Sequence, residues 1–441
     1  MRRIGSLALL LMGVPLFGQN KPMRLIVLDP GHFHATLLQK DMYPELASRV
    51  SVYSPLGPEL LDYLNRISLF NSRPVTPTHW DLDVHCTPHS LGEMLHDLAG
   101  DIVVFTGRNR GKIDRMLLTI SAGLHVLADK PWIISSSDMP KLEHALDLAE
   151  TRHLAAYDIM TERYEVTSEL QRELVNTPEV FGEPVKGDAQ NPGVVAKSIH
   201  HVMKVVAGVP LRRPAWFFDV AEYGEGLADV GTHVVDLVQW TLLPDQVFDY
   251  RKDIHVLEGR RWPLTLTGEQ FRMVTGEVRD GKLDYYCNNA VHYTLRGIHV
   301  KLDILWNWEA PPGSGDVYEA AFRGTRAIAE IRQGAPEKFL PEVYIVPVAD
   351  ARAAVFTALK KKVDELQARW PGLAIQQGDT QARLVIPEKF RVGHEEHFAQ
   401  VARRFFLYAK DPHSLPAWER SYMLAKYYVS TRGVELAIQN K

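Results

Sequence analysis

Short apolar runs alternate with amphipathic stretches through the first third of the chain, beginning after Lys21. The apolar runs predict buried β-strands over residues 24–28, 50–53, 80–86, 101–106, 125–128 and 153–158. Apolar residues at helical spacing predict α-helices over residues 34–46, 58–67, 90–98, 112–122 and 138–151. Strands that alternate with helices form a doubly wound parallel sheet, so we expect residues 21–160 to form an α/β domain of this kind.

The pattern changes in the second half of the chain, where aromatic and β-branched residues dominate. Residues 282–310 and 316–331 contain such residues with turn signals between them, which predicts an open antiparallel sheet with long strands. Residues 341–388 have the pattern of a strand, a helix and two strands, which we interpret as a compact α/β insert. Helices over residues 394–409 and 416–437 end the chain. We therefore expect a C-terminal α+β domain over residues 161–441.

Residues 1–20 have the pattern of a secretory signal peptide. Arg2 and Arg3 precede an apolar run from Ile4 to Phe17, and small and polar residues follow that run. The run is too short to span a bilayer as a stable helix. We expect this segment to be removed on export and the protein to be periplasmic or secreted.

Composition and charge limit the classes of partner. The chain has 441 residues, of which 46% are hydrophobic and 24% are charged, and its formal net charge is −4 at pH 7. A chain of this kind folds as a globular protein of about two or three domains. It offers no basic field for the phosphates of nucleic acid or for anionic lipid, so we expect neither nucleic-acid nor membrane binding.

The turn after the first strand, DPGHFHA at residues 29–35, is where a dinucleotide-binding domain places a Gly-x-Gly-x-x-Gly motif against the pyrophosphate. Only the central glycine, Gly31, is present. The second strand ends in Tyr53, Ser54 and Pro55 rather than in an acid that would bind a ribose hydroxyl. The choice between NAD and NADP therefore stays open.

The same turn contains a His-x-His pair, His32 and His34, which supports a second interpretation. Metal-dependent amidohydrolases begin their site on a β/α barrel with such a pair, and two neutral imidazoles at this spacing can face one cation. A site of that kind needs further ligands, and a strand-end Asp is not evident in the sequence. We assign no metal site here and keep a metal-dependent hydrolase as an alternative.

The segment GLHVLADKPWII, residues 123–134, resembles a strand and turn of the Gfo/Idh/MocA family, which includes glucose-fructose oxidoreductase and inositol dehydrogenase. The family pattern is G-x-H-V-x-x-E-K-P, and Asp129 stands here in place of the Glu, followed by Lys130 and Pro131. Further segments resemble family motifs in the same order: residues 101–109 (DIVVFTGRN), 161–164 (TERY), 181–183 (FGE) and 224–240 (GEGLADVGTHVVDLVQW).

This resemblance implies an N-terminal Rossmann domain for a dinucleotide and an open antiparallel-sheet domain for substrate binding and oligomerisation. The cofactor that it implies is NAD or NADP. The implied cofactor-binding residues are Gly31, His32, Phe33, Thr106, Asn109, Asp129, Lys130 and Pro131. The family's proton relay corresponds to Lys130, Asp229 and His233.

The spacing of these residues is consistent with acid–base chemistry. Asp229, His233 and Asp236 lie four and three residues apart, so on one helix their side chains share a face. Asp229 would then orient His233 as a general acid or base, and the ammonium of Lys130 would stabilise negative charge on a substrate oxygen. The residues that we expect to contact the substrate are His200, His201, Lys204, Trp216 and Asp236.

Together these features predict an exported NAD(P)-dependent oxidoreductase that acts on a sugar or sugar derivative and forms a homo-oligomer. An exported enzyme meets little free dinucleotide, so we expect a tightly bound cofactor that is recycled within each turnover. One alternative is a glycoside-cleaving enzyme that oxidises the sugar ring transiently so that a substituent can be eliminated. Another is a binding protein that has lost its cofactor.

Overall fold

The computed structural model describes residues 21–206 and 209–440, so the predicted signal peptide lies outside the described residues. The first sheet is parallel and contains β1 (Met23–Leu28), β2 (Leu46–Ser54), β3 (Asp81–Cys86), β4 (Ile102–Phe105), β5 (His125–Ala128) and β6 (Ala156–Asp158). The helices between these strands are α1 (His34–Leu37), α2 (Pro58–Ser72), α3 (Ser90–Asp97), α4 (Lys112–Ser121) and α5 (Met139–Thr151). The spatial order of the strands is β3-β2-β1-β4-β5-β6. This order confirms the predicted Rossmann-type sheet, and its direction reverses between β1 and β4, where such folds bind ligands.

Helix α1 ends much earlier than the sequence predicted. Apolar spacing predicted a helix over residues 34–46, whereas α1 stops at Leu37 and β2 already begins at Leu46. Pro44 excludes a helix that reaches residue 46, because proline lacks the amide donor that a helix needs and disfavours helical backbone at the residue before it.

The second sheet is mixed and mostly antiparallel. In spatial order it contains β10 (Ile254–Leu266), β11 (Leu283–Leu295), β12 (Ile298–Glu309), β7 (Val194–Met203), β13 (Val317–Arg323), β14 (Ala327–Arg332), β15 (Glu342–Pro347), β17 (Ala382–Val385) and β16 (Ala374–Gln377). Neighbouring strands pair antiparallel except β12 and β7, which are parallel. The expected fold class is therefore confirmed, with one parallel pair that the sequence did not predict.

The strands of residues 341–388 extend this sheet instead of forming a compact insert of their own. Strand β15 pairs with β14, and β17 and β16 follow it at the edge. The helix of this segment, α12 (Arg352–Leu366), packs against α7 (Pro178–Phe181). An unpaired β14 would present a row of free backbone donors and acceptors, and pairing with β15 satisfies them.

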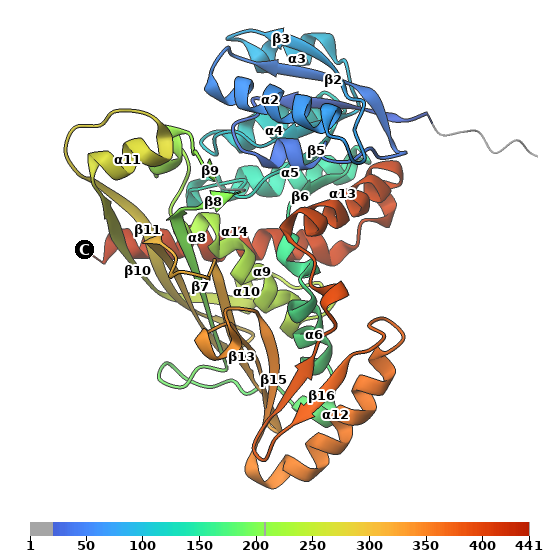
Figure 1. Ribbon diagram of the computed structural model, residues 1–441, viewed down its shortest axis with the longest axis vertical. Coiled ribbons are helices and arrows are strands. Elements are labelled where there is room, and N and C mark those ends of the chain that lie inside the picture. Colours follow the sequence, from blue (N-terminus) through green and yellow to red (C-terminus); the bar gives the residue numbers. More distant parts are fainter. Residues whose placement is uncertain (1–20, 207–208, 441) are drawn as a thin grey trace, which may run out of the picture.

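The two faces of the first sheet pack against different partners. Ile26 and Leu28 of β1 belong to an apolar core that continues into the second domain, whereas Leu25 and Val27 face a core completed by α13. The remaining elements are α6 (Val166–Val175), α8 (Gly226–Asp229), α9 (Gly231–Leu242), α10 (Tyr250–Asp253), α11 (Gly268–Thr275), α13 (His394–Lys410), α14 (Ala417–Gln439), β8 (Val205–Val206) and β9 (Val209–Pro210). Figure 1 shows α13 and α14 at the junction of the domains. Within the described ranges, no helix has both the length and the apolar character needed to cross a bilayer.

A buried network of ion pairs ties this junction together. The Nζ atom of Lys426 on α14 lies 2.7 Å from a carboxylate oxygen of Asp158 and 3.3 Å from one of Asp236. Arg163 lies 2.5 Å from Asp236 and 2.8 Å from Glu419. Burial raises the pKa of Asp236, but the two cations outweigh it and hold that pKa at about 2. Asp236 was predicted to contact the substrate, whereas its carboxylate here is enclosed in this network.

Candidate functional site

Two tight turns meet at the carboxyl ends of β1 and β4. A Cβ atom on Gly107 would lie 2.7 Å from the backbone oxygen of Asp29, and one on Gly31 would lie 3.1 Å from the Cα atom of Gly107. Asp29, at the position of the family's first glycine, has a φ of 47°. This is the left-handed backbone that glycine adopts most readily and that Asp tolerates better than most residues. The first turn thus keeps a glycine-like conformation without that glycine.

Gly107→Ala is expected to destabilise the protein by about 1–3 kcal/mol, because the added methyl group would press on the backbone of Asp29. Gly92→Ala is the matched control, since no described atom lies within 4 Å of a Cβ added there. Gly92 lies inside α3, so its replacement should stabilise by about 0.5–1 kcal/mol. Urea unfolding of the two variants measures the difference, and equal effects would contradict the close approach of the turns.

Lys130 and Asp229 form an ion pair between the two domains. Lys130 follows β5, and its ammonium donates to Oδ1 of Asp229 at the end of α8. The hydroxyl of Tyr223 donates to the same oxygen at 3.0 Å. Burial raises the pKa of Asp229, but the ammonium of Lys130 outweighs it and lowers that pKa. The carboxylate is thus ionised and fixes the ammonium, with help from Tyr223, which the sequence analysis did not identify.

His233 does not pair with Asp229 as predicted. The prediction assumed one continuous helix, whereas α8 ends at Asp229 and α9 begins at Gly231. Nδ1 of His233 is buried and has no hydrogen-bond partner among the described residues. Burial and the ammonium of Lys130 lower the pKa of His233 well below 6.5. Its imidazole is therefore neutral at neutral pH and can accept a proton, and Asp229 orients Lys130 instead.

The ring signals of His233 in an NMR titration are expected not to shift between about pH 8 and 6, because protonation would occur only further into the acidic range. A solvated histidine, with a pKa near 6.5, shifts within that window. Comparison with His233→Gln assigns the signal. A titration midpoint within the window would show that the imidazole is not shielded as the structure indicates.

His200 and His201 of β7 and Lys204, which directly follows this strand, were predicted to contact the substrate and lie around Asp316. Nδ1 of His200 lies 2.9 Å from its carboxylate, Nδ1 of His201 lies 3.4 Å away, and the ammonium of Lys204 also pairs with it. Burial raises the pKa of Asp316, but His200 and Lys204 outweigh it and lower the pKa well below its ordinary range. The His200 ring packs on Trp306, with centroids 5.2 Å apart. The structure thus brings these residues together and adds Asp316 and Trp306, which sequence spacing alone did not identify.

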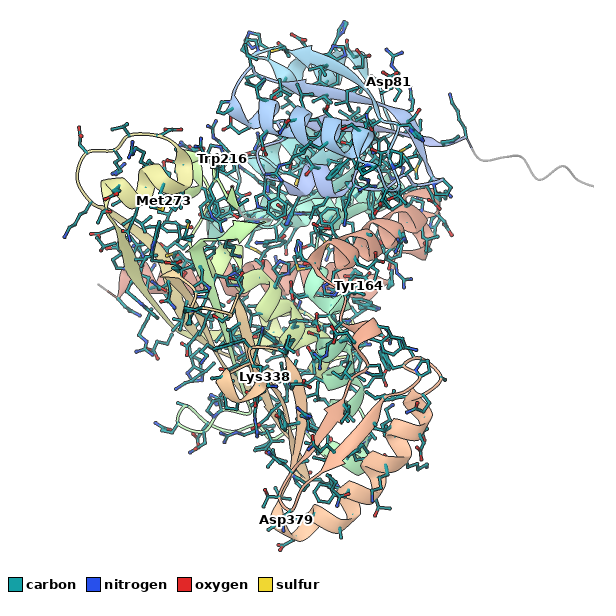
Figure 2. The ribbon with its side chains drawn as sticks, in the orientation of Figure 1. Asp81, Tyr164, Trp216, Met273, Lys338 and Asp379 are labelled. Carbon is teal, nitrogen blue, oxygen red and sulfur yellow. The ribbon has the colours of Figure 1, made fainter. Side chains whose placement is uncertain are left out.

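Trp216 lies at a different place from the one predicted. Its ring atom Cζ2 would be 2.8 Å from a Cβ on Gly31, and its Nε1 donates to Glu59 of α2 at 3.0 Å. Figure 2 shows Trp216 where the N-terminal domain meets the second domain. Trp216 therefore covers the first turn of the Rossmann domain, and the prediction that it contacts the substrate is not supported by its position.

Asn109 has a structural role where a cofactor contact was predicted. Its Nδ2 donates to the backbone oxygen of Tyr223 at 2.6 Å, and its Oδ1 accepts from Nζ of Lys112 at 2.6 Å. Lys112 also donates to the backbone oxygens of Asp129 and Pro131, at 2.8 and 3.1 Å. Both polar ends of Asn109 are thus occupied within the protein. No sequence motif identified Lys112, which holds the turn that positions Lys130.

Three ionisable side chains converge beside this turn. Nδ1 of His32 and Nδ1 of His34 lie 3.1 and 2.9 Å from the same oxygen, Oδ2 of Asp129. Burial and the neighbouring His34 lower the pKa of His32 to about 4, so its imidazole is neutral at neutral pH. The other oxygen of Asp129, Oδ1, is buried and finds no hydrogen-bond partner in the described part of the chain.

A cleft of about 310 Å³ opens between the domains at this edge of the sheet. Residues that line it include Gly31, His32 and Phe33 of the first turn, Glu59 and Arg66 of α2, and Arg213 of the second domain. Its volume falls at the lower end of the range for small-molecule sites. Of the residues predicted to bind the cofactor, Gly31, His32 and Phe33 therefore line the cleft.

Comparisons with known proteins relate the chain to oxidoreductases. Residues 170–438 match the family model described as "Putative oxidoreductase C terminal domain". A crystal structure of a protein from Parabacteroides merdae, described as a putative oxidoreductase, is 40% identical, with a TM-score of 0.92, and the match covers 95% of this chain and 98% of that one. A search of curated proteins finds no match.

Two more distant structures share the fold. GenD2 from gentamicin A biosynthesis, in complex with NAD, is 15% identical with a TM-score of 0.57, and the match covers 95% of each chain. KijD10, a 3-ketoreductase from Actinomadura kijaniata in complex with NADP and TDP-benzene, is 14% identical with a TM-score of 0.56, and the match covers 93% of this chain and 97% of that one. The chain therefore belongs to the oxidoreductase family defined by this C-terminal domain.

Proposed function

We propose that the protein is an exported oxidoreductase that uses NAD or NADP to act on a sugar or sugar derivative. The observation that carries the proposal is the Lys130–Asp229 ion pair, with a neutral His233 on the next helix, at the carboxyl edge of a Rossmann sheet. When a hydride moves to or from the carbon of a secondary alcohol, the alcohol oxygen needs a group that transfers its proton and a group that stabilises its negative charge. A neutral imidazole can do the first, and a fixed ammonium can do the second.

A nicotinamide dinucleotide fits the residues at this edge. Oγ1 of Thr106 and Oδ1 of Asp129, which follow β4 and β5, are buried without hydrogen-bond partners among the described residues. They can accept hydrogen bonds from a polar ligand, and the turn at Gly31, His32 and Phe33 opens to the cleft. These residues would hold the dinucleotide, which supplies the hydride acceptor or donor when bound.

The protein's own groups would manage the proton and the charge. In the direction of oxidation, neutral His233 takes the proton of the substrate hydroxyl. The ammonium of Lys130 hydrogen-bonds the same substrate oxygen and stabilises the negative charge that develops there. Asp229 and Tyr223 keep the ammonium in place through the two hydrogen bonds to Oδ1 of Asp229. In the direction of reduction the proton returns from His233.

The second domain offers the surface for a sugar. His200 and Lys204 supply hydrogen-bond donors, and Trp306 supplies an aromatic face beside His200. The distant relatives GenD2 and KijD10 support this choice of substrate class, since one comes from the biosynthesis of gentamicin A and the other is a 3-ketoreductase complexed with TDP-benzene. We extend the proposal to a tightly bound, internally recycled cofactor because the signal-peptide pattern at residues 1–20 indicates export.

The test is a panel of free sugars and glycosides, incubated with the protein with and without added NAD⁺ or NADP⁺. Mass spectrometry of the products and the absorbance of reduced nicotinamide follow the reaction. Oxidation that needs added cofactor supports a dehydrogenase, and conversion without it supports a recycled cofactor. Release of a glycosidic substituent would assign the elimination chemistry. If no sugar changes under either condition, the proposed substrate class is wrong.

A further inference from the structure

We propose that His32, His34 and Asp129 form a binding site for one divalent transition-metal ion beside the cleft, which His32 lines. This inference goes beyond the proposed function and does not depend on it, because hydride transfer with a nicotinamide needs no metal. From the sequence, His32 was assigned to cofactor binding, and the pair His32 and His34 was kept as an alternative metal site for which no strand-end Asp was evident. The structure supplies the third ligand in Asp129, which directly follows β5.

The geometry of the three side chains suits one ion. Their ligand atoms lie within 4.8 Å of one another, and both Nδ1 atoms face Oδ2 of Asp129 at 3.1 and 2.9 Å. Two ligands at about 2.1 Å from a tetrahedral zinc ion are about 3.4 Å apart, so these separations need only small side-chain rotations to match. The imidazoles themselves are in contact, with ring centroids 4.2 Å apart.

The charge at Asp129 favours a cation. Its carboxylate is 7% exposed, and its only ion-pair partners in the described part of the chain are the two histidines. The nearby ammonium groups are committed elsewhere: that of Lys112 donates to Asn109 and two backbone oxygens, and that of Lys130 donates to Asp229. Burying a carboxylate without a compensating charge costs several kcal/mol, roughly, and a bound divalent cation would supply that charge.

A second cluster in the protein also joins two histidines to one aspartate, but it contains an ammonium group as well. His200 and His201 lie beside Asp316 as the other two histidines lie beside Asp129. The ammonium of Lys204, however, also pairs with Asp316 and already supplies a permanent positive charge. A cation would have to compete with that ammonium, so this second cluster is the internal control.

The ligand set indicates the kind of metal and how it would be used. Two imidazoles and one carboxylate suit zinc, iron, cobalt and manganese rather than calcium or magnesium. Three protein ligands leave at least one position open, as in catalytic metal sites. Because His32 also lines the cleft, that position would be filled by water or by an oxygen atom of the molecule that occupies the cleft.

The first test measures metal retention by the full, tag-free protein. The protein is stripped with EDTA, incubated with ZnCl₂, passed through a gel-filtration column and analysed for zinc by elemental mass spectrometry. We expect about one zinc ion per chain in the wild type and in the control variant His200→Asn, and at least about tenfold less in His34→Asn and Asp129→Asn. A wild type that retains no zinc, or variants that retain as much as the wild type, would overturn the proposal.

A second measurement tests the site in the wild type, so that the proposal can be tested even if the variants fail to fold. CoCl₂ added to the stripped wild type is expected to produce visible d–d absorption that prior addition of ZnCl₂ prevents, and zinc should raise the melting temperature of the wild type but not of His32→Asn. Absence of both effects in the wild type would contradict the site. Dinucleotide content is measured on the same samples. Bound dinucleotide without metal binding overturns this inference alone, and metal binding without dinucleotide overturns the proposed function alone.

Discussion

Lys130→Met is expected to lower kcat by about 10²–10³-fold, because it removes the ammonium that the proposed mechanism uses to stabilise charge on the substrate oxygen. That charge develops in the transition state, so KM should change much less than kcat. The measurement is steady-state kinetics on a substrate found in the sugar panel, together with a urea unfolding curve to show that the variant is folded.

Lys141→Met is the matched control for this variant. Lys141 also belongs to the N-terminal domain, but its pairs with Asp114 and Asp138 lie on the surface, with 44% of its own side chain exposed. Its replacement should leave kcat unchanged. A folded Lys130→Met enzyme that loses less than about tenfold in kcat would show that the ammonium does not act on the reacting oxygen.

Lys426→Met is expected to lower the free energy of unfolding by about 3–5 kcal/mol, because it leaves the carboxylates of Asp158 and Asp236 buried with one cation fewer. Urea unfolding at pH 7 measures the loss. Arg420→Met, on the same helix, removes a pair with Asp147 at the surface and should change stability by less than about 1 kcal/mol. Similar losses in the two variants would contradict a special role for the buried network.

The acid side of the stability curve tests the same network. The pKa of Asp236 is about 2 in the folded protein, below its ordinary value of 3.8. Its ionisation therefore contributes stability that is complete above pH 3.8 and is lost as the pH falls through about 2. Removal of Lys426 should flatten this part of the curve.

Most of the fold could be predicted from the sequence, because the patterns that indicate helices and strands are local. Apolar runs and helical spacing identified the strands and helices of the first domain, and the one large error, at residues 34–46, arose where Pro44 was given too little weight. The edge strands β15, β16 and β17 were identified as strands but not as part of the main sheet. Which sheet a strand joins depends on contacts between distant residues, and the periodicity of the segment does not report them.

The site could be predicted only in part, because many of its contacts join residues that lie far apart in the sequence. The resemblance to family motifs placed Lys130 and Asp229 at the centre, and the structure joins them in an ion pair. Helical spacing, however, could not reveal the break between α8 and α9 that separates His233 from Asp229. Nor could a sequence show that Lys426 encloses Asp236, or that Lys112 positions the turn before Lys130, because those contacts join residues from distant parts of the chain.

The identity of any small molecule that the purified protein carries would show whether the Rossmann domain binds a nicotinamide dinucleotide. The protein is denatured, and the supernatant is analysed by mass spectrometry and by absorbance. We expect NAD(H) or NADP(H) in about stoichiometric amount, and the mass of the released molecule would also decide between the two cofactors. A protein that releases no dinucleotide, and that fails to bind NAD or NADP when either is added, would contradict the central claim that the Rossmann domain serves a nicotinamide-dependent oxidoreductase.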